Sequence, residues 1–326
     1  MPAGIPNTAA LVAGFTELLS TTFRAVKREV ADNVSNHNAL WRRLQEKGNY
    51  RYEDGGVSIQ CPVEYQANST VQRYSGFDTL SIQASDVITT AEFPWRQMAG
   101  NLPVSGFEMR SNQGEARIVN LVKAKIKNLE HSLANQLSSD VYSSGTLANQ
   151  INGLQALIAD GQTGTVGGIN SSTWTFWQNQ LYGFGAQSVT PSAATIMAAL
   201  ESIWESTVRG KDQPDLYMAD AVYWGYTIAA MEALQRYTNT GDIKAGITSL
   251  KFKGADFVYD STASGMPASH VYAINTDYME LVVHRDADLE PLPERASINA
   301  DATVTPVIWQ GNLIVTNRAR QGVVKA

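Results

Sequence analysis

Residues 115–142 read EARIVNLVKAKIKNLEHSLANQLSSDVY and are the clearest periodic stretch of the chain. Their apolar residues recur at spacings of three and four, as they do along one face of an α-helix. The stripe consists of Ile118, Leu121, Val122, Ile126, Leu129, Leu133, Leu137 and Val141. No proline interrupts it, and Gly145 follows shortly after it. The pattern therefore predicts one long helix, with Lys123 and Lys127 off its apolar stripe.

On the N-terminal side of this helix the apolar period changes to two. Apolar and polar residues alternate over residues 57–65 and again over 87–95. This pattern predicts two strands, each with one face covered. Residues 74–78 supply turn chemistry between them, and Pro62 favours an edge position because proline cannot donate to a ladder. We therefore expect a long hairpin over residues 49–105. An isolated two-stranded hairpin is marginal in water, so one this long needs bracing, which a neighbouring subunit could supply.

The remaining segments mix helical and strand patterns. Helices are predicted around residues 7–30, 38–47, 191–208 and 221–237, and strands around 215–218, 252–259, 270–274, 279–284 and 303–316, with an acidic turn region between the last two strands. A glycine-rich stretch, residues 164–168, lacks the lysine and the strand context of a phosphate loop. Helices and strands do not alternate regularly enough for a doubly wound parallel sheet. The predicted fold class is therefore α+β.

Composition indicates a surface that a partner covers. The chain has 326 residues, of which 44% are hydrophobic and only 17% charged, against roughly 25% charged residues in a typical domain. A lone monomer of this composition would expose much uncharged surface, which usually marks an interaction face. The net charge of −6 is not the broad basic footprint of a dedicated nucleic-acid binder.

Targeting and catalytic signals are missing from the sequence. Cys61 is the single cysteine, so no intrachain disulfide is possible, and neither a secretory signal nor an apolar run that could span a membrane is present. We expect a soluble chain made in the cytosol. No dinucleotide fingerprint, nucleophile elbow or paired histidine on a helix occurs. We expect no catalytic residue, no cofactor and no metal ligand.

One acidic stretch leaves an alternative open. Asp286, Asp288 and Glu290 stand at alternate positions, a spacing that could suit Ca²⁺. The stretch lacks the glycine and the closing glutamate of an EF-hand, so solvated charge is the favoured interpretation. Cation binding at residues 286–290 stays open.

The serial order of helical arm, hairpin, long helix, mixed middle and returning strands resembles the major capsid proteins of tailed phages, of the Hong Kong 97 type. Local stretches that carry the resemblance are residues 93–106, 166–177, 250–255, 271–275 and 309–318. It covers nearly the whole chain. In that family's terms it implies an N-terminal arm (1–48), an E-loop hairpin (49–105), a P-domain spine helix (106–150), an A-domain (151–275), and returning P-domain and C-terminal strands (276–326).

The resemblance implies a structural protein and not an enzyme. Its expected function is self-assembly as hexamers and pentamers into an icosahedral shell around phage double-stranded DNA, formed in the host bacterial cytoplasm and present in the virion. Expected intersubunit contacts are Phe15 and Phe23 of the arm and Tyr74, Phe77 and Trp95 of the E-loop. Lys123 and Lys127 are candidates to face packaged DNA without sequence preference.

Two departures from the family pattern refine this expectation. The type member joins subunits through an E-loop lysine and a neighbour's asparagine, whereas residues 51–105 contain no lysine. The shell is therefore expected to be non-covalent. The family's long N-terminal scaffolding extension is also missing, which favours a separate scaffolding protein beside a portal and a decoration protein.

Two alternatives remain at this stage. An encapsulin-like nanocompartment shell would have the same fold and load a cargo enzyme in place of DNA. A soluble α+β hydrolase, from another class, predicts a monomer or small oligomer with a concave polar pocket.

Overall fold

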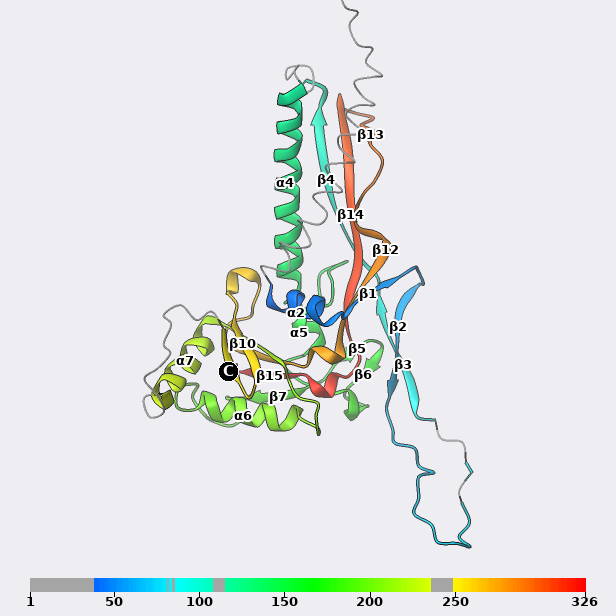
Figure 1. Ribbon diagram of the computed structural model, residues 1–326, viewed down its shortest axis with the longest axis vertical. Helices are drawn as coiled ribbons and strands as arrows, with labels where there is room; N and C mark the ends of the chain where they lie inside the picture. Colours follow the sequence, from blue (N-terminus) through cyan, green and yellow to red (C-terminus); the bar gives the residue numbers. More distant parts are fainter. Residues whose placement is uncertain (1–37, 81, 84–85, 108–114, 236–248) are drawn as a thin grey trace, which may run out of the picture.

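The computed structural model describes residues 38–80, 82–83, 86–107, 115–235 and 249–326. In Figure 1 a tall part, formed by a long helix and the strands beside it, rises from a broader base, and a hairpin projects away from that base. The helix predicted over residues 7–30, with Phe15 and Phe23, lies outside the described residues.

The tall part is built on a five-stranded sheet. Its strands are β1 (Tyr50–Glu53), β4 (Arg96–Ser105), β12 (Met279–Pro291), β13 (Arg295–Ala296) and β14 (Ala302–Val315). The long strand β14 pairs antiparallel with β4 along one edge and with β12 and β13 along the other, and β1 runs parallel to β12. The predicted long helix is confirmed as α4 (Glu115–Asp140), which runs beside β4 (Figure 1).

A six-stranded sheet forms the base. Its order is β7 (Gln180–Gly183), β15 (Gly322–Lys325), β11 (His270–Ile274), β8 (Leu216–Ala219), β10 (Ala255–Tyr259) and β9 (Ser249–Phe252). Helices α6 (Ile196–Thr207) and α7 (Ala221–Gln235) pack against one face. There they enclose a cluster that we call the second core, which includes Leu200, Ile203, Val271 and Ala273.

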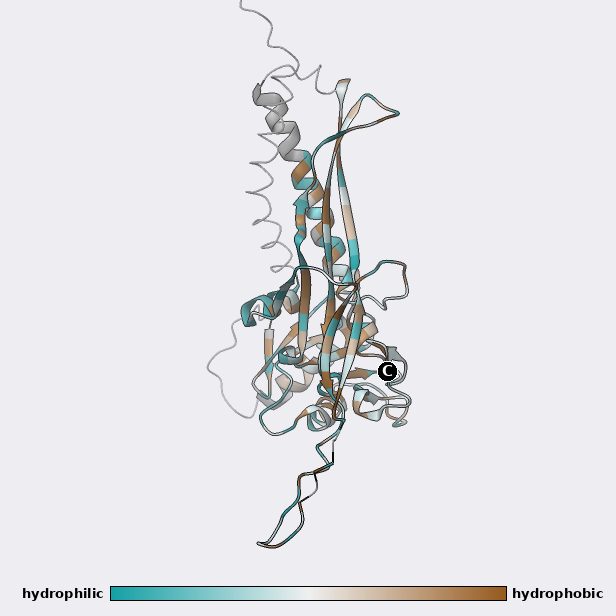
Figure 2. Ribbon diagram, turned by 90° about the vertical axis from the view of Figure 1, so that its right-hand side faces the viewer, coloured by the Kyte–Doolittle hydropathy of each residue, from teal (hydrophilic) through white to brown (hydrophobic). Residues whose placement is uncertain are grey.

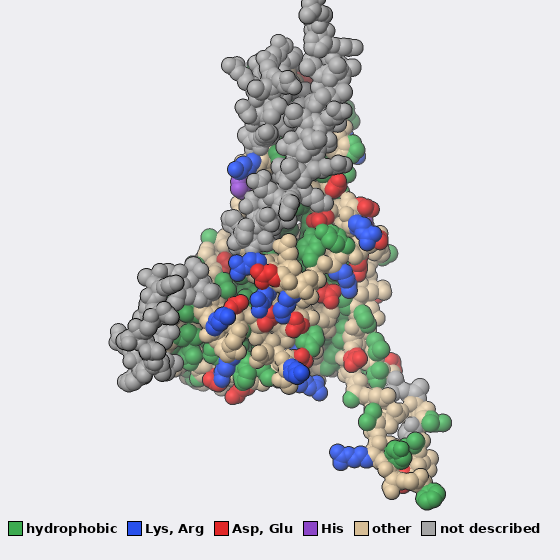
Figure 3. All heavy atoms as spheres, viewed as in Figure 1, with side chains coloured by type: hydrophobic (Ala, Val, Ile, Leu, Met, Phe, Trp, Pro, Cys, Tyr) green, Lys and Arg blue, Asp and Glu red, His purple; other side chains and the backbone are tan. Residues whose placement is uncertain are grey.

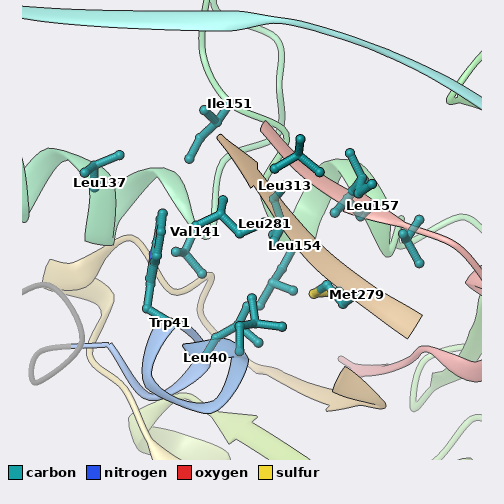
Figure 4. Close-up of a cluster of buried hydrophobic side chains, with 14 of the residues drawn as sticks. Leu40, Trp41, Leu137, Val141, Ile151, Leu154, Leu157, Met279, Leu281 and Leu313 are labelled. Carbon is teal, nitrogen blue, oxygen red and sulfur yellow. The ribbon is translucent and has the colours of Figure 1, made fainter. Parts of the chain in front are cut away.

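The other face of this sheet packs against a larger cluster, the first core. It contains Tyr272 and Ile274 of β11 together with residues of helix α2 (Ala39–Lys47), the C-terminal half of α4, the short helix α5 (Leu154–Leu157) and the five-stranded sheet. Figure 4 shows Leu40, Trp41, Leu137, Val141, Leu154, Leu281 and Leu313 converging at this point. The alternation of β11 side chains between the two clusters makes the six-stranded sheet the seam between them. Figure 2 shows apolar residues along the tall strands as well.

Helix α2 belongs to the packed body of the protein. Asn38 caps it, since its Oδ1 accepts hydrogen bonds from the backbone N–H groups of Leu40 (3.0 Å) and Trp41 (3.3 Å). Gly48, at φ 74°, ends it in the left-handed region that favours glycine. Leu40, Trp41 and Leu44 are buried. Residues 38–48 therefore pack in the first core, although the sequence groups them with the N-terminal arm.

Three predicted elements differ from the structure. The strand expected over residues 252–259 is two antiparallel strands, β9 and β10, which turn at Lys253 and Gly254. The acidic turn region is wrong, because β12 continues to Pro291 with a register shift between Val283 and Asp288. The hairpin is shorter than residues 49–105. Only β2 (Ser58–Glu64) and β3 (Ile88–Pro94) pair with each other, and the flanking β1 and β4 join the five-stranded sheet.

The sequence pointed to a neighbouring subunit as a possible brace for the paired strands, but the same chain supplies the brace. Ile59, Cys61 and Val63 of β2 and Ala91 and Phe93 of β3 are buried in the first core of their own chain. We call residues 58–64 and 88–94 the stalk. Alternation in the sequence shows that one face of each strand is buried, but it does not show which part of the protein buries it.

A tight turn at Gly167 and Gly168, far along the chain, contacts the stalk and holds it in place; we call this contact the clip. Gly167 (φ 58°) and Gly168 (φ 76°) connect the short strands β5 (Thr165–Val166) and β6 (Ile169–Asn170), as in a type I′ hairpin. The carbonyl oxygen of Gly167 accepts a hydrogen bond of 2.9 Å from the backbone N–H of Glu92 in β3. The glycine-rich stretch is thus an ordered turn that holds the stalk.

The two glycines give a matched test of this clip. A Cβ on Gly167 would lie 2.9 Å from Phe93 Cζ and 3.1 Å from Ala91 Cβ, whereas one on Gly168 would meet nothing within 4 Å. Both alanine variants carry the strain of a positive φ, about 1 kcal/mol. Gly167→Ala must also displace the stalk, so we expect it to lower the free energy of unfolding by about 2–3 kcal/mol in total. Urea denaturation measures both variants, and equal losses would show that the clip does not constrain the stalk.

Candidate assembly surfaces

Beyond the stalk, the hairpin continues as a projecting segment, which we call the tip and which the structure describes at residues 65–80, 82–83 and 86–87. Its last ladder contact is the hydrogen bond from the Tyr65 N–H to the Val87 carbonyl, 3.1 Å. A local turn then forms where the Ser75 N–H donates to Asp78 Oδ2 (2.7 Å) and the Asp78 N–H donates to the Ser75 carbonyl (2.8 Å). This turn presents Phe77 at the far end of the hairpin.

The tip exposes large apolar side chains to water. Phe77 is fully exposed, and Ile82, Val71 and Tyr74 are 95%, 82% and 66% exposed. Figure 3 shows hydrophobic side chains gathered on the projecting segment. Burial of a side chain of this size contributes about 1.5–3 kcal/mol, and no described part of the same chain covers these four. The tip is therefore an apolar surface suited to a partner.

The structure separates the three predicted E-loop contacts. Tyr74 and Phe77 lie on the tip, as expected for a projecting loop. Trp95 instead lies at the other end of the stalk, half-buried, where its Nε1 donates to the Gly56 carbonyl (3.0 Å) and its ring meets the ring of His284 edge-on at 5.8 Å. Trp95 holds the junction between β3 and β4, and its contact with a neighbour stays a prediction.

An aromatic cluster sets the direction in which the tip leaves the body. The ring of Tyr65 lies 5.8 Å from that of Trp174 and 6.0 Å from that of Phe176. Next to them Trp177 is buried, and its Nε1 donates to the Val166 carbonyl (2.9 Å). Edge-to-face aromatic pairs of this kind stabilise by about 0.5–1.5 kcal/mol beyond burial. The first residue of the tip is thus fastened to its own subunit.

The sequence did not identify every member of the apolar surface. Val71 and Ile82 belong to no periodic pattern, and Val57 and Ile88, exposed near the two ends of the stalk, fall inside the alternating runs. Turn chemistry at residues 74–78 was the signal that located Tyr74 and Phe77. Large apolar residues scattered singly through a polar segment would have been the signal for Val71 and Ile82.

The basic residues of α4 have different environments. Lys125 Nζ donates to the Pro103 carbonyl in β4 (3.1 Å) and so ties the helix to the sheet. Lys127 is exposed, and the side chain of Lys123 lies outside the described residues. That these lysines face DNA stays a prediction.

One acidic residue of β12, Asp288, contacts two tyrosines. Asp288 accepts hydrogen bonds from the hydroxyls of Tyr50 (3.1 Å) and Tyr52 (3.0 Å). Burial and the charge of Asp288 raise the pKa of Tyr52 to about 12. Within the described ranges, no group of three or more histidine, cysteine or acidic side chains is arranged to hold a metal ion.

A cavity of about 230 Å³ lies between α4, the β4–β14 pair and residues 147–151. Asp140 is the one charged residue among those that line it. Its Oδ1 accepts hydrogen bonds from Gln136 Nε2 (2.9 Å) and Gln150 Nε2 (3.3 Å). A single carboxylate held by two amides offers no acid–base pair of the kind that hydrolysis uses.

Among the helices that the structure describes, none has the length and hydropathy to cross a membrane.

Comparison with known proteins identifies the fold. No family model matches the sequence, and no curated protein matches it. Solved structures do match. A chain of the cyanophage A-1(L) capsid asymmetric unit superposes with a TM-score of 0.62 at 15% identity, covering 86% of this chain and 91% of that chain. The capsid of an empty GTA particle gives 0.51 at 13% identity (86% and 94% covered), and that of cyanophage P-SCSP1u gives 0.51 at 12% (85% and 85%).

These likenesses define the class of the fold. The chain has the α+β capsid fold of the Hong Kong 97 type, which confirms the predicted fold class. The projecting tip, the long helix and the two sheets are parts of that one architecture.

A charge placed on the tip tests whether the tip lies outside the subunit's own core. Phe77→Asp should change the free energy of unfolding of the unassembled chain by no more than about 0.5 kcal/mol, because the side chain is already in water. Leu137→Asp places the same charge on α4, where Leu137 is 3% exposed, and should prevent folding or destabilise by more than about 4 kcal/mol. Thermal and urea unfolding compare the two, and similar losses would show that the tip belongs to an ordinary core.

Proposed function

We propose that this protein is a major capsid protein that self-assembles as hexamers and pentamers into an icosahedral shell around double-stranded DNA. The observation that carries the proposal is the apolar tip, anchored by its own subunit yet uncovered by it, on a chain with a capsid fold. The low share of charged residues supports the same conclusion.

The geometry favours rings over isolated pairs. A tip that projects from one side of a subunit and docks on a different surface of the next makes a heterologous contact. Such contacts close into a ring when the rotation angle between neighbours is a whole-number fraction of a full turn. Fivefold and sixfold rings are the units of an icosahedral shell. Stable interfaces of this kind bury about 1,200–2,000 Å² in total, of which the tip would supply one part.

The parts of the subunit take their proposed roles from this arrangement. The E-loop would consist of the stalk and tip within residues 49–105, and the spine helix of the P-domain would be α4 within 106–150. The A-domain would hold most of the six-stranded sheet within 151–275, with β15 supplied from the returning segment 276–326. The N-terminal arm, 1–48, would reach a neighbour with the part that precedes α2, including Phe15 and Phe23.

The proposal assigns partners and a location but no chemistry. The subunit would act without catalysis or cofactor, assemble in the host cytoplasm with a separate scaffolding protein and a portal, and accept a decoration protein on the finished virion. DNA would be held without sequence preference, with Lys123 and Lys127 as candidate contacts.

Assembly of the purified chain tests the proposal directly. Wild-type protein, alone or with its scaffolding partner, should elute as capsomers or larger and show shells by negative-stain electron microscopy. Phe77→Asp should abolish shells, because burying an unpaired carboxylate costs several kcal/mol at every copy of the contact, whereas Phe77→Leu should retain them. A 35.5 kDa monomer at high concentration with no shells even beside the scaffolding partner would contradict the proposal. Particles loaded with a cargo enzyme in place of DNA would indicate the nanocompartment alternative.

The chemistry of the tip gives a second prediction. Residues 51–105 contain no lysine, so no isopeptide bond can start from this hairpin. Boiled and reduced particles should run as one subunit band on a denaturing gel. A persistent ladder of multimers would show that covalent links arise elsewhere in the chain.

A further inference from the structure

Two electrostatic links connect the six-stranded sheet to the segments that pack with it in the first core. The first lies at Asp215, directly before β8. Its Oδ2 receives Arg43 Nε and Lys47 Nζ of α2, each at 3.1 Å. Both Asp215 oxygens also accept hydrogen bonds from Thr276, Oδ1 from the backbone N–H (2.8 Å) and Oδ2 from Oγ1 (2.7 Å). Arginine and lysine stay charged across the physiological pH range, so this link does not depend on pH there.

The second link lies at His270, the first residue of β11. Its Nε2 is 3.1 Å from Asp160 Oδ2, and its Nδ1 is 2.7 Å from the Ala268 carbonyl oxygen. Asp160 follows α5 and so belongs to the segment that packs in the first core. Because β11 runs antiparallel to β8, pairing Ile274 with Leu216 and Val271 with Ala219, His270 and Asp215 lie at opposite ends of the same strand pair.

The partners of His270 determine its protonation state. A carbonyl oxygen can only accept a hydrogen bond, and so can an ionised carboxylate. The hydrogen bond to His270 and its charge keep the pKa of Asp160 below its ordinary value, against the effect of burial. Each ring nitrogen therefore has to donate, and only the imidazolium carries a hydrogen on both. A neutral ring would point one lone pair at an oxygen.

The other groups around the ring do not supply an alternative partner. Lys325 stands opposite on β15, paired with His270 in the ladder, and its charge opposes protonation. The Asp220 carboxylate, at the end of β8, accepts from the backbone N–H groups of Ser269, Val222 and Tyr223. The Tyr272 ring stacks on the imidazole with centroids 6.1 Å apart. Burial lowers the pKa of His270, but Asp160 and the Ala268 carbonyl together raise it above its ordinary value.

We propose that His270 is a proton-dependent link that fastens the segment after α5 to the six-stranded sheet, so that the seam between the two cores loosens at this end when the ring loses its proton. The Asp215 end holds throughout. This inference concerns the single subunit and is independent of whether the chain assembles. Because the pKa of His270 is higher in the folded chain, the link contributes fully below the ordinary histidine pKa and is lost as pH rises through the folded value.

Ring ¹⁵N chemical shifts of the full chain, below its assembly concentration, report the protonation state directly. At pH 6.5 both nitrogens of His270 should show imidazolium shifts, and Asp160→Asn should lower the midpoint of this titration. His131→Gln, at an exposed histidine on α4, is the control and should leave it unchanged. A neutral His270 tautomer at pH 6.5, or a midpoint that Asp160→Asn does not move, would overturn the proposal.

Hydrogen exchange then tests the mechanical consequence. After correction for the intrinsic pH effect, amides in residues 158–164 and 268–273 should lose protection between pH 6 and pH 9 in the wild type. Asp160→Asn should abolish this pH dependence, because its amide can donate to a neutral ring as well as accept from a protonated one, and Asp215→Asn should keep the wild-type pH dependence. If Asp160→Asn retains the full pH dependence of these segments, the ring is not the link. This variant preserves shape and hydrogen-bonding capacity, so its outcome does not rest on whether His270→Gln folds.

Discussion

The contact between β3 and the Gly167 turn fixes the buried half of the hairpin, the stalk, from which the unburied tip projects. Phe93 and Ala91 lie against a glycine that has no room for a Cβ, and the stalk is fixed there by a backbone hydrogen bond. A two-stranded ribbon has no third strand to cover it, so each residue of the hairpin depends on whatever lies beside it. The stalk has the first core beside it. The tip has nothing from the described part of its own chain, and its apolar side chains stay in water.

A fixed stalk changes what an exposed tip can do. A freely moving loop would lose conformational entropy each time it docked, whereas a segment whose first residue is packed against two aromatic rings arrives partly ordered. The body behind the tip is also held in place: the two cores share one sheet, and the Asp215 and His270 links lie at opposite ends of its β8–β11 strand pair. The subunit thus presents its unburied surface from a defined direction, which is what a repeated contact in a closed shell requires.

Periodicity in the sequence was enough to predict α4, the paired strands and the α+β class, because a 3.6- or 2-residue period directly reports which side chains share a buried face. It could not give the partners. β1 pairs with β12 and β4 with β14 across some two hundred residues of chain, and neither run differs in composition from a hairpin strand. Trp95 was grouped with Tyr74 and Phe77 because it continues an alternating run, although its indole is bound at the junction with β4. No sequence pattern singled out His270, because its proposed role depends on a contact with Asp160 that only the fold creates.

The central claim is that another copy of the chain covers the tip. Cys61 is the only cysteine and is 1% exposed, so Phe77→Cys introduces one accessible thiol at the far end of the hairpin. The rate of maleimide labelling, measured on unassembled subunits and on particles of the same variant, reports whether that position is covered. The account predicts rapid labelling of the free subunit and strong protection in the particle. Equal rates in the two states would contradict it.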